Sequence, residues 1–360
     1  MQDVETWNHN GISLKARIAL PDGDGPFPVV MAIHGGAFSG GDRNRFENSF
    51  FKHYTDMGIA VMSIEYRLTA NNEGGQHPRA IQDCMHNLHW LRDHADDYNF
   101  DTTRVALQGS SAGSYLAMML ALTCRQQDFQ PDFGPYQHKK ATVAAVISCA
   151  AMYDWTAISN GGNYISGSRH DPAASPVNLA AQSACPAFLL LGGANDTDWS
   201  PPQPAHQMQD SLQQHGVYCE LHLKPNHGHP GFYGTTDEFS AWAWERVDPF
   251  VEKYLIQANT RIKKNDTAEP EQKLKAVPNP CNPQTTIMYD LNKSQRVTIS
   301  IYSTLGQKIA TLVDAFQSSG HHAIHWSGSD DRGARVASGL YFIHCKTAQS
   351  AITHKIIVMQ

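Results

Sequence analysis

The sequence lacks several features that would assign the protein to familiar classes. No apolar stretch is long enough to span a membrane, and no basic run accompanies the net charge of −6, which argues against nucleic acid as a partner. None of the seven cysteines forms a close Cys-x-x-Cys pair, so zinc is not expected. The first residues lack the basic and apolar regions of a signal peptide. What remains is a globular protein, and 360 residues suffice for two domains or one large one.

The most informative motif that is present is GSSAG at residues 109–113. The apolar-rich residues 104–108 before it favour a strand, and residues 115–122 after it favour a helix. A G-x-S-x-G turn between a strand and a helix is strained and tight, and it holds the serine hydroxyl clear of the sheet at the positive end of the helix. Glycines are needed because a side chain at either end would crowd the neighbouring backbone. We therefore predict Ser111 as a nucleophile.

A second glycine-rich segment, HGGAF, follows a buried strand predicted at residues 28–33. A loop of this kind can direct consecutive backbone N–H groups at the oxygen of a tetrahedral intermediate. The alternative interpretation is an ordinary turn at the end of a strand. His34 is expected to brace the loop by hydrogen bonding. The residues assigned to the oxyanion hole are Gly35, which shapes the loop, and Gly36, Ala37 and Ala112, which donate N–H groups.

An acid and a histidine are expected later in the chain, in that order. The buried strand at residues 187–191 opens into a loop with two carboxylates, and we favour Asp196 over Asp198 because it lies where the loop turns back. The last strand of this region ends in a loop that contains His227 and His229. A histidine after the last strand can serve as general base and acid. We predict His229 for this role, with His227 as the alternative.

Residues 10–256 resemble an α/β-hydrolase of the bimodular feruloyl-esterase-like group, which is related to hormone-sensitive lipase and kynurenine formamidase. The segments that carry the resemblance are HGGAFSGGDRNRF, IEYRLT, IQDCMHNLHWLRDHADDYNFDTTRVALQGSSAG, ASPVNLAAQSACPAFLLLGGAND and GHPGF. The resemblance implies a doubly wound, mostly parallel sheet with Ser111 as nucleophile, Asp196 as acid and His229 as base. It implies no metal and no organic cofactor.

The chain departs from this family in places that surround the predicted site. Phe38 and the pair Ser114-Tyr115 replace residues that are usually Trp and Gly-His, which is expected to alter the pocket wall. The stretch Gln126–Lys140 is longer than usual and is expected to shape the substrate cleft. Trp199 and Tyr153, with Phe38, fall near the site in loop order, and aromatic residues in such places are typical of packing.

The pattern changes after residue 256. An amphipathic helix at residues 239–255, expected to break or restart near Pro249, closes a catalytic domain at residues 1–256. Residues 257–276 are polar and predict a linker. The hydrophobic period then becomes two, which predicts a small all-β sandwich at residues 277–360. Its strands are expected at residues 286–291, 296–302, 321–326, 340–345 and 354–359.

Residues 277–360 resemble the carboxy-terminal sorting domain of type IX secretion, an immunoglobulin-like sandwich with flagellar-hook-capping relatives. The matching segments are VPNPCNPQTTIMYDL, STLGQKIATLV and VASGLYFIHC. The resemblance implies export machinery as a partner, and we expect a mature chain whose leader has been removed. Cys281 replaces the usual Phe of this domain. We interpret the cysteines as buried thiols and leave a bridge between Cys281 and Cys345 open.

Together these observations predict a secreted or cell-surface serine esterase. The expected substrates are small-molecule or polysaccharide-linked esters, with acetyl or feruloyl groups on polysaccharide favoured. A generic short-chain carboxylesterase and an arylformamidase are the alternatives. A surface-binding protein without catalysis belongs to a different class. It is disfavoured because the nucleophile, acid, histidine and oxyanion loop are all present in the sequence.

Overall fold

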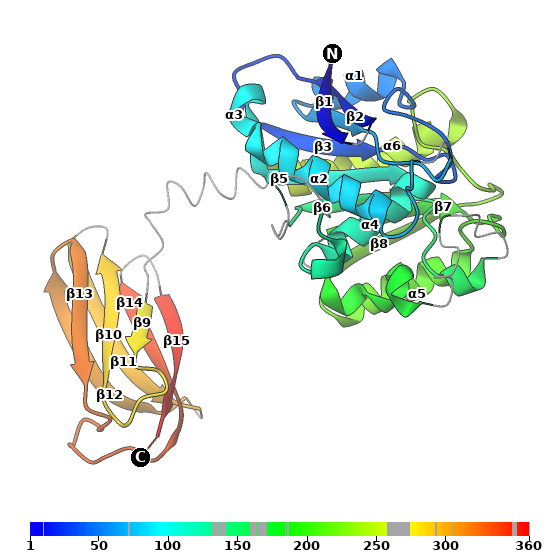
Figure 1. Ribbon diagram of the computed structural model, residues 1–360. Helices are drawn as coiled ribbons and strands as arrows, with labels where there is room; N and C mark the ends of the chain where they lie inside the picture. Colours follow the sequence, from blue (N-terminus) through cyan, green and yellow to red (C-terminus); the bar gives the residue numbers. More distant parts are fainter. Residues whose placement is uncertain are drawn as a thin grey trace. The chain divides into compact units, whose positions relative to one another are not determined.

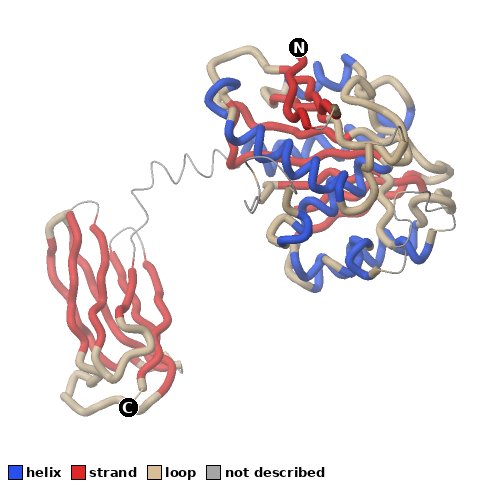
Figure 2. Tube along the Cα trace, in the orientation of Figure 1, coloured by secondary structure: helices blue, strands red, loops and turns tan. Residues whose placement is uncertain are grey.

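The computed structural model divides the chain into two compact units, Met1–Asn259 and Thr260–Gln360. Each unit is described by itself (Figures 1 and 2). The residues that the structure describes are 1–9, 11–70, 73–131, 136, 142–158, 164, 171–183, 185, 187–257, 274–291, 294–304, 306–347 and 351–359.

An eight-stranded sheet forms the centre of the first unit, in the order β1-β2-β4-β3-β5-β6-β7-β8. The strands from β4 to β8 in this order run parallel, whereas β1 and β2 are antiparallel additions at one edge. Every residue of β3, β4, β6 and β7 is buried, which explains why these strands are mostly apolar. The strands are β1 (Gln2–His9), β2 (Ile12–Ala19), β3 (Phe27–Ile33), β4 (Ala60–Ile64), β5 (Phe100–Ser110), β6 (Ala145–Cys149), β7 (Ala187–Gly193) and β8 (Tyr218–Lys224).

Helices cover both faces of this sheet (Figure 1). One apolar layer is formed with α2, α4 and α5, and the other with α1 and α6. The predicted doubly wound α/β-hydrolase class is confirmed. No helix among the described residues is long and apolar enough to cross a membrane. The helices are α1 (Asn48–Asp56), α2 (Arg79–Asp93), α3 (Ala95–Tyr98), α4 (Ala112–Thr123), η1 (Gln127–Phe129), η2 (Trp155–Ala157), η3 (Pro172–Ala174), η4 (Pro176–Asn178), η5 (Ala180–Gln182), α5 (Pro202–Gln214), α6 (Glu238–Val251) and the π-helical η6 (Glu252–Ile256).

Helix α6 passes through Pro249 without a break at that residue, but the α-helix ends nearby at Val251 and restarts as the π-helix η6, as the sequence predicted for this neighbourhood. A proline inside a helix removes one hydrogen bond and costs roughly 3 kcal/mol. Here Val247, Phe250 and Val251 are buried against the sheet on either side of it, and this packing offsets the loss. The Glu252 N–H bonds to the carbonyls of both Asp248 and Pro249, and the π-helical turn η6 follows.

The topology gathers four loops at one edge of the sheet. Strands β3, β5, β7 and β8 are parallel, so their carboxyl ends meet at the same edge. The loops that leave these ends carry the HGGAF segment, Ser111, Asp196 and His229. In open α/β sheets this edge is where ligands bind. Residues that are far apart in the sequence are thereby brought into one region.

The second unit is all-β, with one sheet in the order β13-β10-β9 and another in the order β12-β11-β14-β15. The expected strands all overlap observed ones, but β9 and β12 were not predicted. Residues 274–276, predicted as linker, form part of β9, while predicted linker residues 258–273 lie outside the described residues. The strands are β9 (Leu274–Val277), β10 (Thr285–Leu291), β11 (Gln295–Ser303), β12 (Lys308–Gln317), β13 (Gly320–Trp326), β14 (Gly339–Thr347) and β15 (Ala351–Val358).

All seven cysteines are buried and free, so Cys281 and Cys345 are not bridged. Both lie in the apolar core between the two sheets of the second unit. Burial raises the pKa of the Cys345 thiol to about 11. A thiol in such surroundings stays protonated and unreactive at neutral pH. These cysteines therefore act as small apolar core residues.

Candidate active site

Ser111 lies in the turn that joins β5 to α4, with φ 56° and ψ −121°. Such a backbone conformation costs a non-glycine residue about 1–3 kcal/mol and is typical of functional sites. A Cβ on Gly109 would collide with the carbonyl of Gly113, and one on Gly113 would collide with the carbonyl of Ile33. The Ser111 N–H donates to the carbonyl of Cys149 at 2.8 Å. These contacts hold the serine in its strained conformation.

The three residues predicted as a triad lie in contact. His229 Nε2 is 2.8 Å from Ser111 Oγ, and His229 Nδ1 is 2.5 Å from Asp196 Oδ2. Asp196 is buried, whereas the His229 side chain is 27% exposed. With the Nδ1 proton donated to the carboxylate, Nε2 is left as an acceptor for the serine hydroxyl. The arrangement is suited to removing a proton from Ser111.

The environment of Asp196 keeps its carboxylate ionised. Burial raises the pKa of Asp196, but the hydrogen bond and charge of His229, together with the backbone N–H groups of Trp199 and Ser200, outweigh this effect. The net result is a pKa below the ordinary value. At neutral pH the residue can therefore accept the Nδ1 proton of His229 in a hydrogen bond and stabilise an imidazolium.

The two alternatives left open by the sequence lie elsewhere. Asp198 is exposed and accepts a long hydrogen bond from its neighbour Thr197. The His227 ring packs 5.3 Å from the Phe239 ring, and its carbonyl accepts the Asn195 N–H. Neither side chain is hydrogen-bonded to Ser111 or to the triad partners in the described part of the chain.

Backbone donors lie beside the serine. Within the described residues, the N–H groups of Gly36, Ala37 and Ala112 have no hydrogen-bond acceptor. Gly36 and Ala37 line the cleft, and Ala112 is the first residue of α4. The Gly35 N–H instead donates to the Tyr233 hydroxyl at 3.2 Å. Because this N–H is already engaged, the geometry of Gly35 fits the loop-shaping role rather than a donor to an oxyanion.

A cleft of about 360 Å³ opens over Ser111. Its volume lies in the range of small-molecule sites. Trp199 borders it, with its ring 6.5 Å from the His229 ring. Sequence reasoning did not single out Arg45, Met152 or Tyr233. The lining residues are Gly36, Ala37, Arg45, Ser111, Met152, Trp199, His229, Pro230, Gly231 and Tyr233.

The other aromatic residues that fall near the site by loop order are core residues. Phe38 is buried and stacks on Tyr164, with ring centroids 3.7 Å apart. Tyr153 is buried, and its hydroxyl lies 3.3 Å from Ser148 Oγ. Of the stretch Gln126–Lys140, residues 132–135 and 137–140 lie outside the described part of the chain. The expected role of this stretch in shaping the cleft remains a prediction.

His34 braces the loop from within the protein. Its ring is fully buried, stacks on Tyr66 with centroids 4.4 Å apart, and its Nδ1 is 2.8 Å from the Gly35 carbonyl. Burial lowers the pKa of His34 to about 4, against smaller opposing effects of the Gly35 carbonyl and Asp42. Burial likewise lowers the pKa of His77 to about 4. Both imidazoles are therefore neutral at physiological pH.

These two histidines predict a loss of stability in mild acid. In the unfolded chain a histidine has a pKa of about 6.5, so below this pH the unfolded chain binds protons that the buried histidines of the folded protein do not bind. The free energy of unfolding therefore falls as the pH drops from about 6.5 toward 4. At pH 5.5 the expected loss is about 1 kcal/mol for each residue. Urea unfolding of the intact protein between pH 7 and pH 5 measures it. His77→Gln should reduce the slope of the free energy of unfolding against pH. A free energy of unfolding that does not change between pH 7 and pH 5 in the wild type would contradict the proposed burial effect.

Comparisons with known proteins find relatives of both units. Residues 17–210 match the BD-FAE family, and residues 275–359 match the secretion system C-terminal sorting domain. The probable carboxylic ester hydrolase LipM of Mycobacterium tuberculosis is 29% identical over 229 residues, covering 56% of this chain and 50% of LipM. Ethyl acetate hydrolase of Pseudomonas putida is 27% identical over 124 residues, covering 34% of this chain and 38% of that protein.

Solved structures share the fold. Esterase 2 of Thermogutta terrifontis with propionate bound superposes with a TM-score of 0.60 at 18% identity, covering 70% of this chain and 93% of that structure. A truncated carbohydrate esterase from gut microbiota gives 0.57 at 19% identity, covering 71% and 96%. The chain spans about half the length, or less, of the curated relatives described above. From the extent of the family match, this chain belongs to the BD-FAE family of α/β-hydrolases and carries a secretion system C-terminal sorting domain.

Proposed function

We propose that the protein is a serine hydrolase of carboxylic esters. The observation that carries the proposal is the hydrogen-bonded chain from Ser111 through His229 to Asp196. It lies in an open cleft, beside backbone N–H groups that have no acceptor among the described residues. In the first step, Ser111 Oγ bonds to the ester carbonyl carbon while its proton passes to His229 Nε2. The carbonyl electron pair moves onto the oxygen, which accepts hydrogen bonds from the backbone N–H groups.

The intermediate then loses the alcohol. The carbonyl re-forms, the bond to the alcohol oxygen breaks, and His229 Nε2 gives its proton to that oxygen. Water repeats the sequence on the acyl-enzyme: it bonds to the carbonyl carbon, its proton passes to His229, and Ser111 leaves with that proton. Asp196 stabilises the imidazolium in both halves. Each backbone donor is expected to lower the barrier by about 3 kcal/mol.

For the substrate, we propose acetyl or feruloyl esters linked to polysaccharide. The membership in the BD-FAE family and the fold shared with a carbohydrate esterase support this choice. The sorting domain supports it further, because an exported hydrolase meets polymers outside the cell. A generic short-chain carboxylesterase is the second candidate, favoured by the small cleft and by the relation to an ethyl acetate hydrolase.

A panel of esters separates these candidates. We expect hydrolysis of methyl ferulate or acetylated xylan by the wild-type protein and none by Ser111→Ala. Turnover of only short p-nitrophenyl esters would favour the generic carboxylesterase, and turnover of an arylformamide would favour the formamidase alternative. No hydrolysis of any member would favour a surface-binding protein.

We also propose that residues 275–359 direct export by the type IX machinery, so that the hydrolase acts in the medium or at the cell surface. The match to the sorting domain supports this proposal. In a host that has this secretion system, removing the second unit should leave the esterase activity inside the cell. Secretion at the wild-type level without this unit would contradict the proposed role.

A further inference from the structure

Arg45 is unusual among the residues that line the cleft. It carries the only fixed charge among the described lining residues, since the others are neutral or, in the case of His229, belong to the triad. No aspartate or glutamate is among these lining residues. Arg45 is exposed to solvent. A substrate in the cleft would therefore meet a positive charge without a neighbouring negative charge in the described wall.

The guanidinium of Arg45 has one described contact, the face of the Tyr233 ring, whose centroid lies 5.0 Å from Cζ. The Tyr233 ring is fixed in turn, because its hydroxyl accepts the Gly35 N–H and its edge packs 5.4 Å from Phe46. Cation–π contact leaves the N–H groups at the edge of the guanidinium free to donate. Arg45 is thus held at the cleft while its hydrogen-bonding capacity is unused by the described residues.

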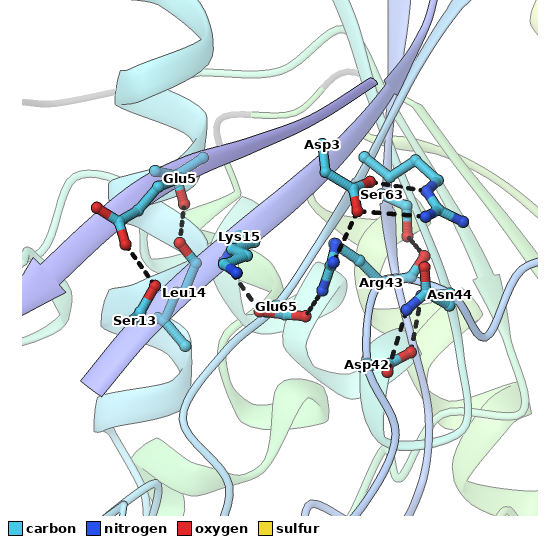
Figure 3. A network of polar contacts seen from close by, with 12 residues as sticks. Asp3, Glu5, Ser13, Leu14, Lys15, Asp42, Arg43, Asn44, Ser63 and Glu65 are labelled. Atoms are coloured by element: carbon cyan, nitrogen blue, oxygen red, sulfur yellow. Dashed lines mark hydrogen bonds and ion pairs between the residues drawn. The ribbon is translucent and has the colours of Figure 1, made fainter. Parts of the chain in front are cut away.

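The loop that carries Arg45 is anchored on one side by Arg43. This residue forms ion pairs with Asp3, at 2.7 Å, and with Glu65. Figure 3 shows Arg43 between these two carboxylates, which come from β1 and from the residue after β4. The two arginines of the sequence GDRNRF therefore have different environments: one joins a network within the protein, and the other borders the cleft.

The turn between the two arginines is also defined. The Asp42 carboxylate accepts the Asn44 N–H at 2.8 Å and the Asn44 side-chain amide at 3.2 Å (Figure 3). The Arg45 N–H donates to the Asp42 carbonyl at 3.1 Å. Phe46, which follows, is buried against Phe50. With its backbone fixed in this way, Arg45 loses less freedom when it binds a ligand than a residue on an unstructured loop would lose.

We propose that Arg45 forms an anion subsite beside Ser111 and selects esters that carry a carboxylate on the acyl or the alcohol side. This inference rests on the proposed ester hydrolysis. A guanidinium presents paired N–H donors that match the two oxygens of a carboxylate. An acylated uronic acid in a polysaccharide has this chemistry on the alcohol side. A half-ester of a dicarboxylic acid has it on the acyl side.

Matched substrate pairs test the subsite. The alcohol-side pair is an O-acetylated methyl galactosiduronate and its uncharged primary amide. The acyl-side pair is monoethyl glutarate and the corresponding amide. We expect the wild-type protein to favour the carboxylate of at least one pair by about tenfold in kcat/KM, with the preference reduced at high ionic strength. Arg45→Gln should abolish the preference, so that the carboxylate and the amide of each pair are hydrolysed with equal kcat/KM. Arg45→Lys keeps the charge and should retain part of the preference.

The outcomes distinguish this proposal from the proposed function. The anion subsite would be overturned if the wild type hydrolysed the carboxylate and the amide of each pair equally well. It would also be overturned if Arg45→Gln lowered kcat/KM for the carboxylate and the amide by the same factor. Ester hydrolysis would stand in both cases. If no ester is hydrolysed, the proposed function fails, and calorimetric titration of Ser111→Ala with galacturonate and with monoethyl glutarate decides about the subsite. Anion binding to Ser111→Ala that is lost in the double variant with Arg45→Gln would support the subsite. No binding of either anion to Ser111→Ala would overturn it.

Discussion

Replacing Ser111 by alanine is expected to lower kcat for ester hydrolysis by roughly a millionfold, the scale seen when a triad serine is removed. The reason is that the acyl-enzyme cannot form without Oγ, and the histidine is left without the proton that it must move. The oxyanion donors remain in Ser111→Ala, so a residual rate above that of water is expected. Initial rates with p-nitrophenyl acetate, at matched concentrations of folded protein, measure the effect.

The adjacent serine of the same motif is a matched control. The Ser110 hydroxyl is buried and accepts the Phe232 N–H at 3.1 Å, so it has a structural partner instead of a place in the triad. Ser110→Ala is expected to lower the free energy of unfolding by about 1–3 kcal/mol, because a buried N–H loses its acceptor, while Ser111 keeps its role. Activity near the wild-type level in Ser111→Ala would sink the assignment of the nucleophile.

Asp196→Asn is expected to lower kcat by about ten-thousandfold. An amide at this position offers an N–H to Nδ1 where the carboxylate accepted one, so His229 would carry its proton on Nε2 and could not accept the proton of Ser111. The protein should still fold, because the amide has nearly the same shape. Steady-state kinetics and circular dichroism of the purified variant together measure the effect.

Asp198→Asn is the control for this second prediction. Asp198 is exposed and is not hydrogen-bonded to His229, so its neutralisation should change kcat by less than about twofold. The opposite ranking, with a large loss in Asp198→Asn and a small one in Asp196→Asn, would show that the acid has been assigned to the wrong carboxylate.

Much of the first unit could be predicted because its strands are buried on both faces. Unbroken apolar runs mark β3 and β7, and the order of serine, acid and histidine then places each functional residue after a strand. Strand β12 lacks this kind of pattern: Ala310 is its only buried residue, so the strand has no buried face that an apolar run or an alternation of apolar residues would mark. Strand β9 has only four residues between a polar run and Pro278, too few for a period to be recognised.

The parts of the site that sequence reasoning missed depend on contacts between distant segments. Arg45 is one arginine in a polar loop, and its place at the cleft follows from the ion pairs of Arg43 and from the Tyr233 ring, which comes from the loop after β8. The engagement of the Gly35 N–H likewise depends on the Tyr233 hydroxyl. Neither contact can be inferred from the amino-acid composition of the segments that make it. At Pro249 the local signal is met in part: α6 passes the proline itself, and the change to a π-helix comes at Glu252.

Labelling with a p-nitrophenyl phosphonate tests most directly whether Ser111 is an activated nucleophile. The reagent needs an activated serine but no particular ester specificity, so it separates the chemistry of the triad from the choice of substrate. We predict the release of one equivalent of p-nitrophenol, one phosphonyl group on the intact protein, and its location on Ser111 by peptide mass spectrometry. No adduct, or an adduct on another residue of a protein that still hydrolyses esters, would contradict the proposed triad.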